Sequence, residues 1–407
     1  MKCRHCSSEL THTFLDLGFA PPSNAYLSKD DLSKSENYYP LKVKVCDKCW
    51  LLQTEDYAPA EEFFNADYAY FSSTSKSWLA HAKQFSEQII QQLGLNKSSH
   101  VIEIASNDGY LLKNFVAEDI PCLGIEPTAS TAAAAEKLGI PILRKFFGEA
   151  LGKLLAAEGK QADLIVGNNV YAHVPDINDF TRGLKAALKS GGTITLEFPY
   201  LGRLLEFTQF DTIYHEHFSY LTLYTVSRIF EQAGLRVWKV EELATHGGSL
   251  RVYGCHAEEN RITHQTVVEL LKKEVIHGMK TLHTYQNFQI RANAVKDELL
   301  SFLIQQKKAG KTVAGYGAAA KGNTLLNYAG IKPDLLPFVC DAAISKQGMY
   351  LPGSHIPILE PAALDQNPPD YVLILAWNIA DEVMAQLDKL RTGGTQFVTA
   401  IPRLQIL

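Results

Sequence analysis

The sequence contains no long apolar run, since none of its segments approaches the roughly 20 residues that a membrane-spanning helix needs. An excess of charge is also absent, because 39 basic and 44 acidic residues leave a formal net charge of -5 without blocks of like charge. The first residues lack the apolar stretch of a secretory signal peptide. From these absences we predict a cytoplasmic protein that binds neither membranes nor nucleic acids.

Low-complexity tracts and short internal repeats are missing as well. The 407 residues, of which 46% are hydrophobic and 20% charged, have the composition of an ordinary globular protein. A chain of this length usually forms two or three domains of about 100 to 200 residues. We therefore expect two or three packed domains with large cores.

Cysteines are few, but four of the seven form two close pairs, Cys3 with Cys6 and Cys46 with Cys49. A C-x2-C turn lets both sulfurs reach one ion at about 2.3 Å, and four thiolates complete the tetrahedral shell of Zn²⁺. Because all four ligands are cysteines, no coordination position stays open, so we predict a structural zinc site rather than a catalytic one. Four unrelated thiols are the alternative. The other three cysteines are isolated and are interpreted as small buried apolar residues: Cys122, Cys255 and Cys340.

Short apolar segments alternate with helical stretches between residues 100 and 250. This alternation is typical of a doubly wound parallel sheet. The expected strands are 100–104, 122–125, 162–166 and 193–197. Ligands of such folds lie at the carboxyl ends of the strands, so the loops that follow these strands are the expected functional site.

A helical, aromatic-rich passage over 61–94 precedes this unit, and residues 258–308 have the pattern of two long amphipathic helices broken near Gly278. A second α/β unit follows, with strands expected over 312–316, 338–341, 371–376 and 396–400. The predicted fold class is α/β, with a small four-cysteine zinc-binding domain followed by two Rossmann-like domains.

The three-glycine fingerprint of dinucleotide-binding folds is absent from the first strand-to-helix turn, which keeps only Gly109. Glu103 lies inside the first strand, and Glu126 ends the second strand, where a carboxylate can accept both hydroxyls of a ribose. One glycine and two acids suit S-adenosylmethionine better than a dinucleotide. Since Ala-Ser-Asn at 105–107 replaces the usual glycine turn of methyltransferases, a tight turn of any α/β protein is the alternative reading.

The third expected strand favours S-adenosylmethionine, because Asn168 and Asn169 leave it and His173 follows shortly after. Two adjacent amides at the end of a buried strand are difficult to explain as core residues. These side chains would lie near the transferable methyl group.

The densest chemistry is the run Tyr214-His215-Glu216-His217. A histidine with a pKa near 6.5 can take a proton near neutral pH while a neighbouring carboxylate orients its ring, which favours acid–base catalysis. A metal site is disfavoured, because ligands on a helix prefer i, i+4 spacing and these histidines are closer in sequence. A solvated polar loop is the remaining alternative.

Together these segments resemble the sugar C-methyltransferases that modify nucleotide-linked 4-keto deoxysugars, the family of the tetronitrose, mycarose and noviose pathway enzymes. The similarity runs nearly end to end. It covers the cysteine pairs and these segments: 68–73 (Tyr-Ala-Tyr-Phe-Ser-Ser), 103–112 (Glu-Ile-Ala-Ser-Asn-Asp-Gly-Tyr-Leu-Leu), 168–176 (Asn-Asn-Val-Tyr-Ala-His-Val-Pro-Asp), 214–218 (Tyr-His-Glu-His-Phe), 246–251 (His-Gly-Gly-Ser-Leu-Arg) and 315–322 (Gly-Tyr-Gly-Ala-Ala-Ala-Lys-Gly). Ser-Asn-Asp-Gly is that family's own form of the glycine turn.

The resemblance implies an S-adenosylmethionine-dependent enzyme that methylates C3 or C5, beside the keto group of a dTDP-4-keto-deoxysugar, through an enolate. It also implies three domains: zinc-binding over 1–62, methyltransferase over 63–255, and a Rossmann-like C-terminal domain over 256–407 that helps hold the nucleotide sugar. Methyl transfer itself requires no metal. The state in solution, monomer or dimer, is left open.

The resemblance further assigns roles to single residues. His217 is expected to remove the proton, with Glu216 and His215 shaping its surroundings. Hydrogen-bond donors to the enolate oxygen are sought among Tyr214, His173 and one of Tyr68 or Tyr70. Contacts to the methyl donor are expected from Glu103, Ala105, Asn107, Gly109, Tyr110, Leu111, Glu126, Pro127, Phe146 (or its neighbour Phe147), Asn168 and Asn169. Contacts to the nucleotide sugar are expected from Tyr200, His246, Arg251, Gly317, Lys321, Asn323, Asp341 and Lys346.

Other functions remain possible on the same residues. An O- or N-methyltransferase would use the same histidine to deprotonate a hydroxyl or an amine. A non-catalytic zinc-containing protein could bind the nucleotide sugar alone. A nicotinamide-dependent oxidoreductase is disfavoured by the incomplete glycine pattern.

Overall fold

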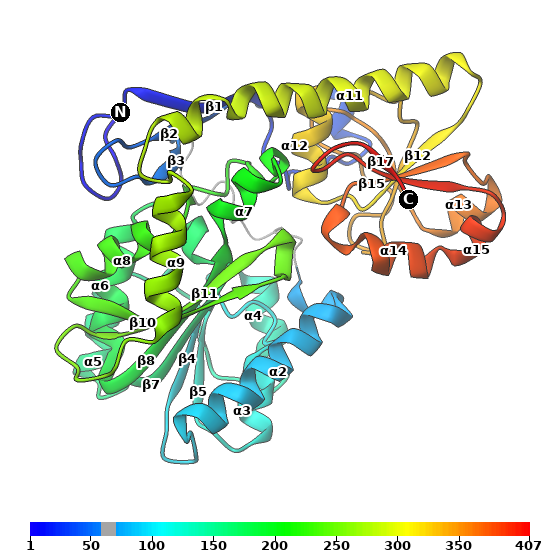
Figure 1. Ribbon diagram of the computed structural model, residues 1–407. Coiled ribbons are helices and arrows are strands. Elements are labelled where there is room, and N and C mark those ends of the chain that lie inside the picture. The colour runs from blue at the N-terminus through cyan, green and yellow to red at the C-terminus, as the bar shows by residue number, and fades with distance from the viewer. Residues whose placement is uncertain (58–70) are drawn as a thin grey trace.

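The computed structural model describes residues 1–57 and 71–407, and its strands form three sheets (Figure 1). The first sheet is antiparallel, in the order β1-β2-β3-β9. Its strands are β1 His12–Ala20, β2 Tyr39–Val45, β3 Leu52–Thr54 and β9 Ser219–Tyr220. Three of these strands come from residues 1–57, which we call the N-terminal lobe. The fourth strand, β9, follows directly on the Tyr214–His217 run.

The second sheet has seven strands in the order β10-β11-β8-β7-β4-β5-β6 and forms the central lobe, residues 71–256. Its strands are β4 Val101–Ile104, β5 Cys122–Ile125, β6 Ile142–Leu143, β7 Ala162–Asn168, β8 Leu188–Pro199, β10 Leu235–Leu243 and β11 Ser249–His256. The first five are parallel, as expected. The last two were not predicted: they form an antiparallel hairpin, because the backbone reverses at His246, Gly247 and Gly248, with φ of 53°, 89° and 117°.

Helices cover both faces of the central sheet (Figure 1). One face carries α2 Lys76–Leu93, α3 Leu112–Ala117 and α4 Ala129–Glu136. The other face carries α5 Glu149–Ala157, α6 Ile177–Ala187 and α8 Leu223–Gln232. A short helix, α7 Leu201–Glu206, follows β8. The two-sided covering explains why the parallel strands are nearly continuous apolar segments.

The third sheet forms the C-terminal lobe, residues 312–407, with strand order β14-β13-β12-β15-β16-β17. Its strands are β12 Val313–Tyr316, β13 Val339–Cys340, β14 Ile358–Leu359, β15 Tyr371–Ile374, β16 Gln396–Thr399 and β17 Gln405–Ile406. Its helices are α12 Ala320–Ala329, α13 Ala362–Gln366, α14 Ala380–Gln386 and α15 Asp388–Thr392. All four strands expected here are present, and 338–341 shortens to the two residues of β13.

Three helices connect the central and C-terminal lobes: α9 Gln265–Ile276, α10 His283–Gln286 and α11 Phe288–Lys308. The predicted break falls at Gly278, whose φ of 71° ends the first helix. Helix α11 runs along the top of Figure 1 and packs against both β1 and α12. A single apolar core includes Leu15 of β1, Ile165 of β7 and Leu373 of β15, so the three lobes pack together. Within the described residues, no helix has the length and apolar character to span a bilayer.

Candidate active site

The four paired cysteines converge at one point of the N-terminal lobe. Their sulfurs lie within 4.8 Å of one another, and Cys3–Cys49 and Cys6–Cys46 are 3.5 Å apart. Sulfurs at about 2.3 Å from a tetrahedral zinc ion are separated by under about 4 Å, so this donor set fits Zn²⁺. In the described part of the chain, no second group of three or more potential metal ligands comes as close together. The predicted zinc site is confirmed, and the three isolated cysteines are buried as expected.

His217 has a defined tautomer. Its Nδ1 lies 2.8 Å from the carbonyl oxygen of Thr212, which assigns the ring proton to Nδ1. Nε2 therefore carries the lone pair and accepts a hydrogen bond from the Tyr214 hydroxyl at 2.8 Å. Burial lowers the pKa of His217 well below its usual range, and His173 beside it and the charge of Lys321 oppose its protonation further. The imidazole is thus neutral, with its basic nitrogen on the side of Tyr214.

His173 lies against His217, with the ring centroids 4.6 Å apart in an edge-to-face arrangement. It belongs to the turn Tyr171–His173 that follows β7, so the fold brings the two predicted histidines together. Burial lowers the pKa of His173 to about 4, although the backbone carbonyl of Glu216 accepts a hydrogen bond from its ring. The protein therefore holds two neutral imidazoles side by side at the carboxyl end of β7.

The other two members of the run, His215 and Glu216, contact the N-terminal lobe. His215 Nε2 donates to the carbonyl oxygen of Pro40 at 3.3 Å, and its ring lies edge-on to Tyr39 of β2. Glu216 is 1% exposed and accepts a hydrogen bond from Asn24 Nδ2 at 3.0 Å. Burial raises the pKa of Glu216 to about 7, and Asn24 opposes this rise. The two tyrosines expected beside these groups, Tyr68 and Tyr70, lie outside the described residues.

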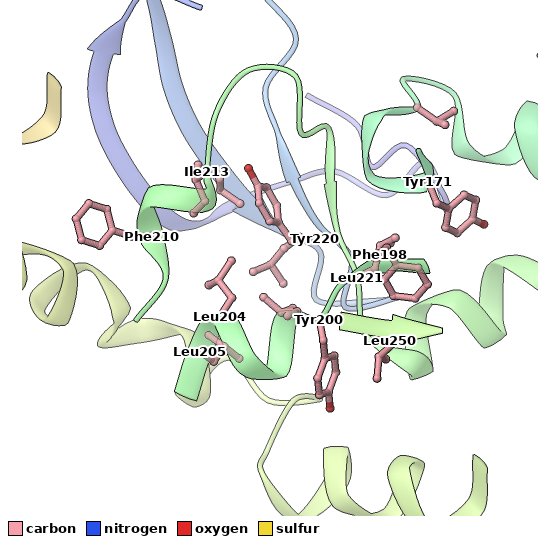
Figure 2. Packing of buried hydrophobic residues seen from close by; sticks show 14 of the residues in the cluster. Tyr171, Phe198, Tyr200, Leu204, Leu205, Phe210, Ile213, Tyr220, Leu221 and Leu250 are labelled. Carbon is pink, nitrogen blue, oxygen red and sulfur yellow. The ribbon is translucent and has the colours of Figure 1, made fainter. Parts of the chain in front are cut away.

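A small cavity adjoins His217, with Thr212, Tyr200 and Tyr220 among its lining residues. Figure 2 shows that the hydroxyl of Tyr220 lies toward Ile213, whereas that of Tyr200 points away from both. The Tyr200 hydroxyl reaches Met279 Sδ, 3.9 Å away, in the segment between α9 and α10. The Tyr200 hydroxyl is thus directed toward the connecting segment, and its expected contact with the nucleotide sugar stays a prediction.

The turn after β4 is held by Glu126. Its carboxylate accepts the backbone N–H groups of Asn107 and Thr128, each at 2.9 Å. The left-handed conformations of Ala105 and Asn107, with φ of 56° and 49°, close the turn where other methyltransferases use glycine. Gly109 has φ of 80°, and a Cβ there would lie 2.4 Å from Ile140 Cδ1. Gly109 is therefore favoured here for two reasons: its left-handed backbone conformation and the lack of room for a side chain.

Buried polar groups gather at the ends of β4 and β7, which are neighbours in the sheet. Both side-chain polar atoms of Asn168 and the Oδ1 of Asn169 have no hydrogen-bond partner among the described residues. Burial raises the pKa of Glu103 well above its usual range, and a hydrogen bond with Tyr110 opposes this. Leaving such groups unpaired costs about 1–3 kcal/mol each. A bound polar ligand would satisfy them, and the ammonium and carboxylate of S-adenosylmethionine fit this set.

The remaining residues expected around the methyl donor are divided between core and surface. Tyr110 and Leu111 are buried, and Pro127 is partly exposed. Phe147 packs edge-to-face on Phe180 of α6 with the centroids 5.3 Å apart, whereas Phe146 is 52% exposed. Of the two phenylalanines, Phe146 is therefore the ring accessible to a ligand.

Arg251 is enclosed in the central lobe by groups that the sequence did not connect with it. Its guanidinium donates to Glu197 Oε2 at 2.7 Å and lies 4.2 Å from the ring centroid of Phe85. His81 is 2.9 Å from the same carboxylate oxygen. Burial by itself would raise the pKa of Glu197, but His81 and Arg251 lower this pKa to about 2. Arg251 thus organises the interior of the lobe, and its contact with substrate remains a prediction.

A second network joins the central and C-terminal lobes. Trp377 Nε1 donates to Asp211 Oδ2 at 2.6 Å, and Lys321 Nζ lies 4.8 Å from the Trp377 ring centroid while donating to Asn378 Oδ1 at 2.7 Å. Burial raises the pKa of Asp211 to about 6, although the positive charge of Lys321 lowers this pKa. The charge of Lys321 also lowers the pKa of His246, whose Nε2 lies 2.9 Å from Asn169 Nδ2.

Sequence reasoning missed Asp211, Trp377 and Asn378. A sequence signal for Trp377 and Asn378 was present, because they follow the apolar strand β15. Asn168 and Asn169 lie in the same way at the end of β7 and just after it. Large or polar side chains at the carboxyl end of a parallel strand lie where ligands bind in such folds. No comparable pattern marks Asp211, whose position depends on packing between lobes.

The remaining C-terminal residues surround the turn after β12. Asp341 accepts the backbone N–H groups of Ala318 and Ala343 at 2.7 and 2.8 Å, and Lys346 Nζ lies 3.5 Å from Asp341 Oδ2. Gly317 has φ of 92° and donates its N–H to the carbonyl oxygen of Cys340. Asn323 is directed elsewhere, because its Nδ2 donates to the Ser23 carbonyl of the N-terminal lobe at 2.7 Å.

The Rossmann-like sheet, the acid-held turn and the buried histidine pair define an S-adenosylmethionine-dependent methyltransferase joined to a zinc-binding lobe. Three family models match the chain: a zinc-binding domain over 3–64, a methyltransferase domain over 78–240 and a C-methyltransferase C-terminal domain over 244–402. The chain is 33% identical over 406 residues to the C-methyltransferase NovU of Streptomyces niveus, covering 100% of this chain and 96% of that relative. The chain therefore belongs to the C-methyltransferase family.

Solved methyltransferases are similar to part of the chain. A Haloferax volcanii methyltransferase in complex with its Trm112 activator has 13% identity and a TM-score of 0.34, covering 44% of this chain and 96% of its own. Magnesium protoporphyrin IX methyltransferase from Synechocystis, with bound S-adenosylmethionine, has 11% identity and a TM-score of 0.33, covering 44% of this chain and 80% of its own.

Proposed function

We propose that this enzyme methylates a carbon next to the keto group of a nucleotide-linked 4-keto deoxysugar, with dTDP as the nucleotide. The observation that carries the proposal is the neutral His217, whose Nε2 faces Tyr214 and whose ring packs on His173 in the turn after β7. A carbon acid needs a base that is unprotonated at neutral pH and donors that stabilise the resulting oxyanion. His217 supplies the base and Tyr214 supplies a donor, while His173 packs against His217 with its ring N–H on the Glu216 carbonyl.

The mechanism follows from the acidity of carbon beside a ketone, since the carbanion left by proton removal is an enolate. His217 takes the proton on Nε2 as the Tyr214 hydroxyl turns from that nitrogen to the developing enolate oxygen. Bound S-adenosylmethionine supplies a sulfonium methyl group, which moves to the enolate carbon as the S–C bond breaks. Glu126 would hold the ribose of this donor, and Asn168 and Asn169 would satisfy its methionine end.

The C-terminal lobe is suited to the nucleotide. Gly317 and Lys321 provide a glycine turn and a cation near the start of α12, an arrangement that binds pyrophosphate in related folds. Lys321 is also close enough to lower the pKa of His217. A pyrophosphate at Lys321 would place the attached sugar toward the histidine pair.

The decisive experiment incubates the enzyme with S-adenosylmethionine and a dTDP-4-keto-6-deoxy sugar in D2O, with the sugar analysed by mass spectrometry and NMR. We expect one methyl on carbon, deuterium at an exchangeable position beside the ketone, and a rate reduced about 10²- to 10⁴-fold in His217→Ala. NMR also assigns the methyl to C3 or C5. The exposed His283→Ala on α10 serves as the matched control and should retain full activity.

Two results would overturn this proposal. Methyl on oxygen or nitrogen without deuterium exchange would identify an O- or N-methyltransferase. Tight binding of the dTDP sugar without any turnover would identify a non-catalytic nucleotide-sugar-binding protein.

A further inference from the structure

Residues 21–26 of the N-terminal lobe extend from β1 into the contact between the other two lobes. The Ser23 carbonyl accepts the hydrogen bond of Asn323 from α12, and the Tyr26 hydroxyl donates to the carbonyl oxygen of Ala318 at 2.6 Å. On the central side, Thr324 of α12 donates to the Ile213 carbonyl at 2.9 Å, one residue before the Tyr214–His217 run. The start of α12 therefore holds both this segment and the residue that precedes the run.

Asn24 of this segment contacts the run itself. Its Nδ2 donates to Glu216 Oε2 at 3.0 Å, and Glu216 is 1% exposed. Glu216 is connected to both histidines: its backbone carbonyl accepts from the ring of His173, and its peptide precedes His217. Fixing the Glu216 side chain thus restricts the backbone that aligns the two imidazoles.

We propose that Asn24 is a positioning residue for the methylation reaction, supplied by the zinc-binding lobe and acting through Glu216. A charge-assisted hydrogen bond to a buried carboxylate is about twice as strong as a neutral one, and few other donors can reach an acid enclosed to this degree. The inference rests on the proposed function, in which His217 removes the proton while His173 packs beside it. Asn24 is proposed to act through Glu216 and not on the reacting atoms.

The test compares Asn24→Ala with Asn178→Ala. Asn178 of α6 is a matched control, because it also joins the N-terminal and central lobes, through the carbonyls of Arg4 and His5, without contacting Glu216. We expect kcat to fall about 10- to 100-fold in Asn24→Ala, the effect of one hydrogen bond to a charged group. The pH at which kcat is half-maximal on the acid side should also rise, because Asn24 favours the ionised form of Glu216. Asn178→Ala should leave this pH unchanged.

A second measurement requires no turnover. In protein carrying isotope-labelled histidine, NMR should show the ring signals of His173 and His217 shifted in Asn24→Ala and unmoved in Asn178→Ala. Unchanged histidine signals and an unchanged pH profile in Asn24→Ala, with the wild-type enzyme active, would overturn the role of Asn24 alone. A wild-type enzyme that methylates no carbon would instead contradict the proposed function, and the NMR comparison would still decide whether Asn24 positions the pair.

Discussion

Buried carboxylates with raised pKa values occur outside the histidine pair as well. Glu274 of α9 is 0% exposed and accepts the backbone N–H groups of Leu223 and Tyr224 at the start of α8, at 2.7 and 2.9 Å. Burial raises the pKa of Glu274 to about 7, and the two N–H groups limit the rise. Glu274 therefore joins α9, one of the connecting helices, to α8 of the central lobe.

Glu274 makes stability depend on pH with a definite sign. In the unfolded chain the carboxyl ionises near pH 4.5, whereas in the folded protein it stays protonated up to about pH 7. Between these values the folded state binds more protons, so this contribution to stability is lost as pH rises. We predict that Glu274→Gln gains stability relative to wild type across this window, on the order of 3 kcal/mol by pH 8.

Denaturant unfolding at a series of pH values measures this difference. The exposed Glu269→Gln on the same helix is the control and should parallel wild type throughout. A Glu274→Gln variant whose difference from wild type is constant with pH would contradict the assignment.

The residues that the sequence identified are those with a local signal. Glu126 ends an apolar strand and His217 lies in a dense polar run, so both could be named without coordinates. Glu274 and Asn24 carry no such signal, because their burial and partners depend on segments far away in the chain. Arg251 shows another limit of the sequence, which placed it in a motif but could not show that its guanidinium donates to Glu197.

Among the elements, β9 connects the zinc site to the histidine pair. β3 begins shortly after Cys49 and pairs with β9, and Thr54 of β3 donates to the carbonyl oxygen of His217 at 3.2 Å. Arg4, between the first two cysteines, lies 5.0 Å from the ring centroid of Phe218. The four-cysteine site is therefore connected to the run through β3, which contacts both His217 and the strand that follows it.

Removal of zinc by a chelator should impair methylation far more than donor binding. We expect the rate to fall about 100-fold, as for a catalytic group displaced by about 1 Å. Affinity for S-adenosylmethionine, measured by calorimetry, should stay the same, because the contacts of Glu126 with the turn lie within the central lobe. Added zinc should restore the rate, and equal losses of rate and affinity would show that the central lobe itself depends on the metal.

The predicted strands of both Rossmann-like units are present because each is a short, continuous apolar segment between turns. β9 could not be predicted, since two residues carry no periodicity and their partner strand β3 lies far earlier in the chain, among the first 57 residues. The antiparallel hairpin of β10 and β11 was likewise missed, because it depends on the left-handed turn at His246.

At the scale of the whole molecule, α11 joins the lobes through its apolar face. Phe288 is 0% exposed and stacks on Phe14 of β1 with the centroids 4.6 Å apart. The same helix packs against α12 of the C-terminal lobe. The shared core predicts that the lobes lose structure together.

Phe288→Ala tests this coupling. Deleting a fully buried phenylalanine costs about 3–5 kcal/mol of unfolding free energy. We expect the unfolding transitions followed by tryptophan fluorescence and by far-ultraviolet circular dichroism to shift by the same amount. Ile290→Ala on the same helix, 67% exposed, should cause almost no change. Separate transitions for the two probes would show that the lobes unfold independently.

The strand β9 also limits how such proteins can be recombined. A cut between the zinc-binding segment and the methyltransferase segment, placed by linear position, would separate β3 from the strand that completes its sheet. A functional hybrid must inherit residues 1–57 and the stretch around β9 from the same parent. Exchange of sequence between relatives is therefore expected to preserve these two distant stretches as one heritable unit.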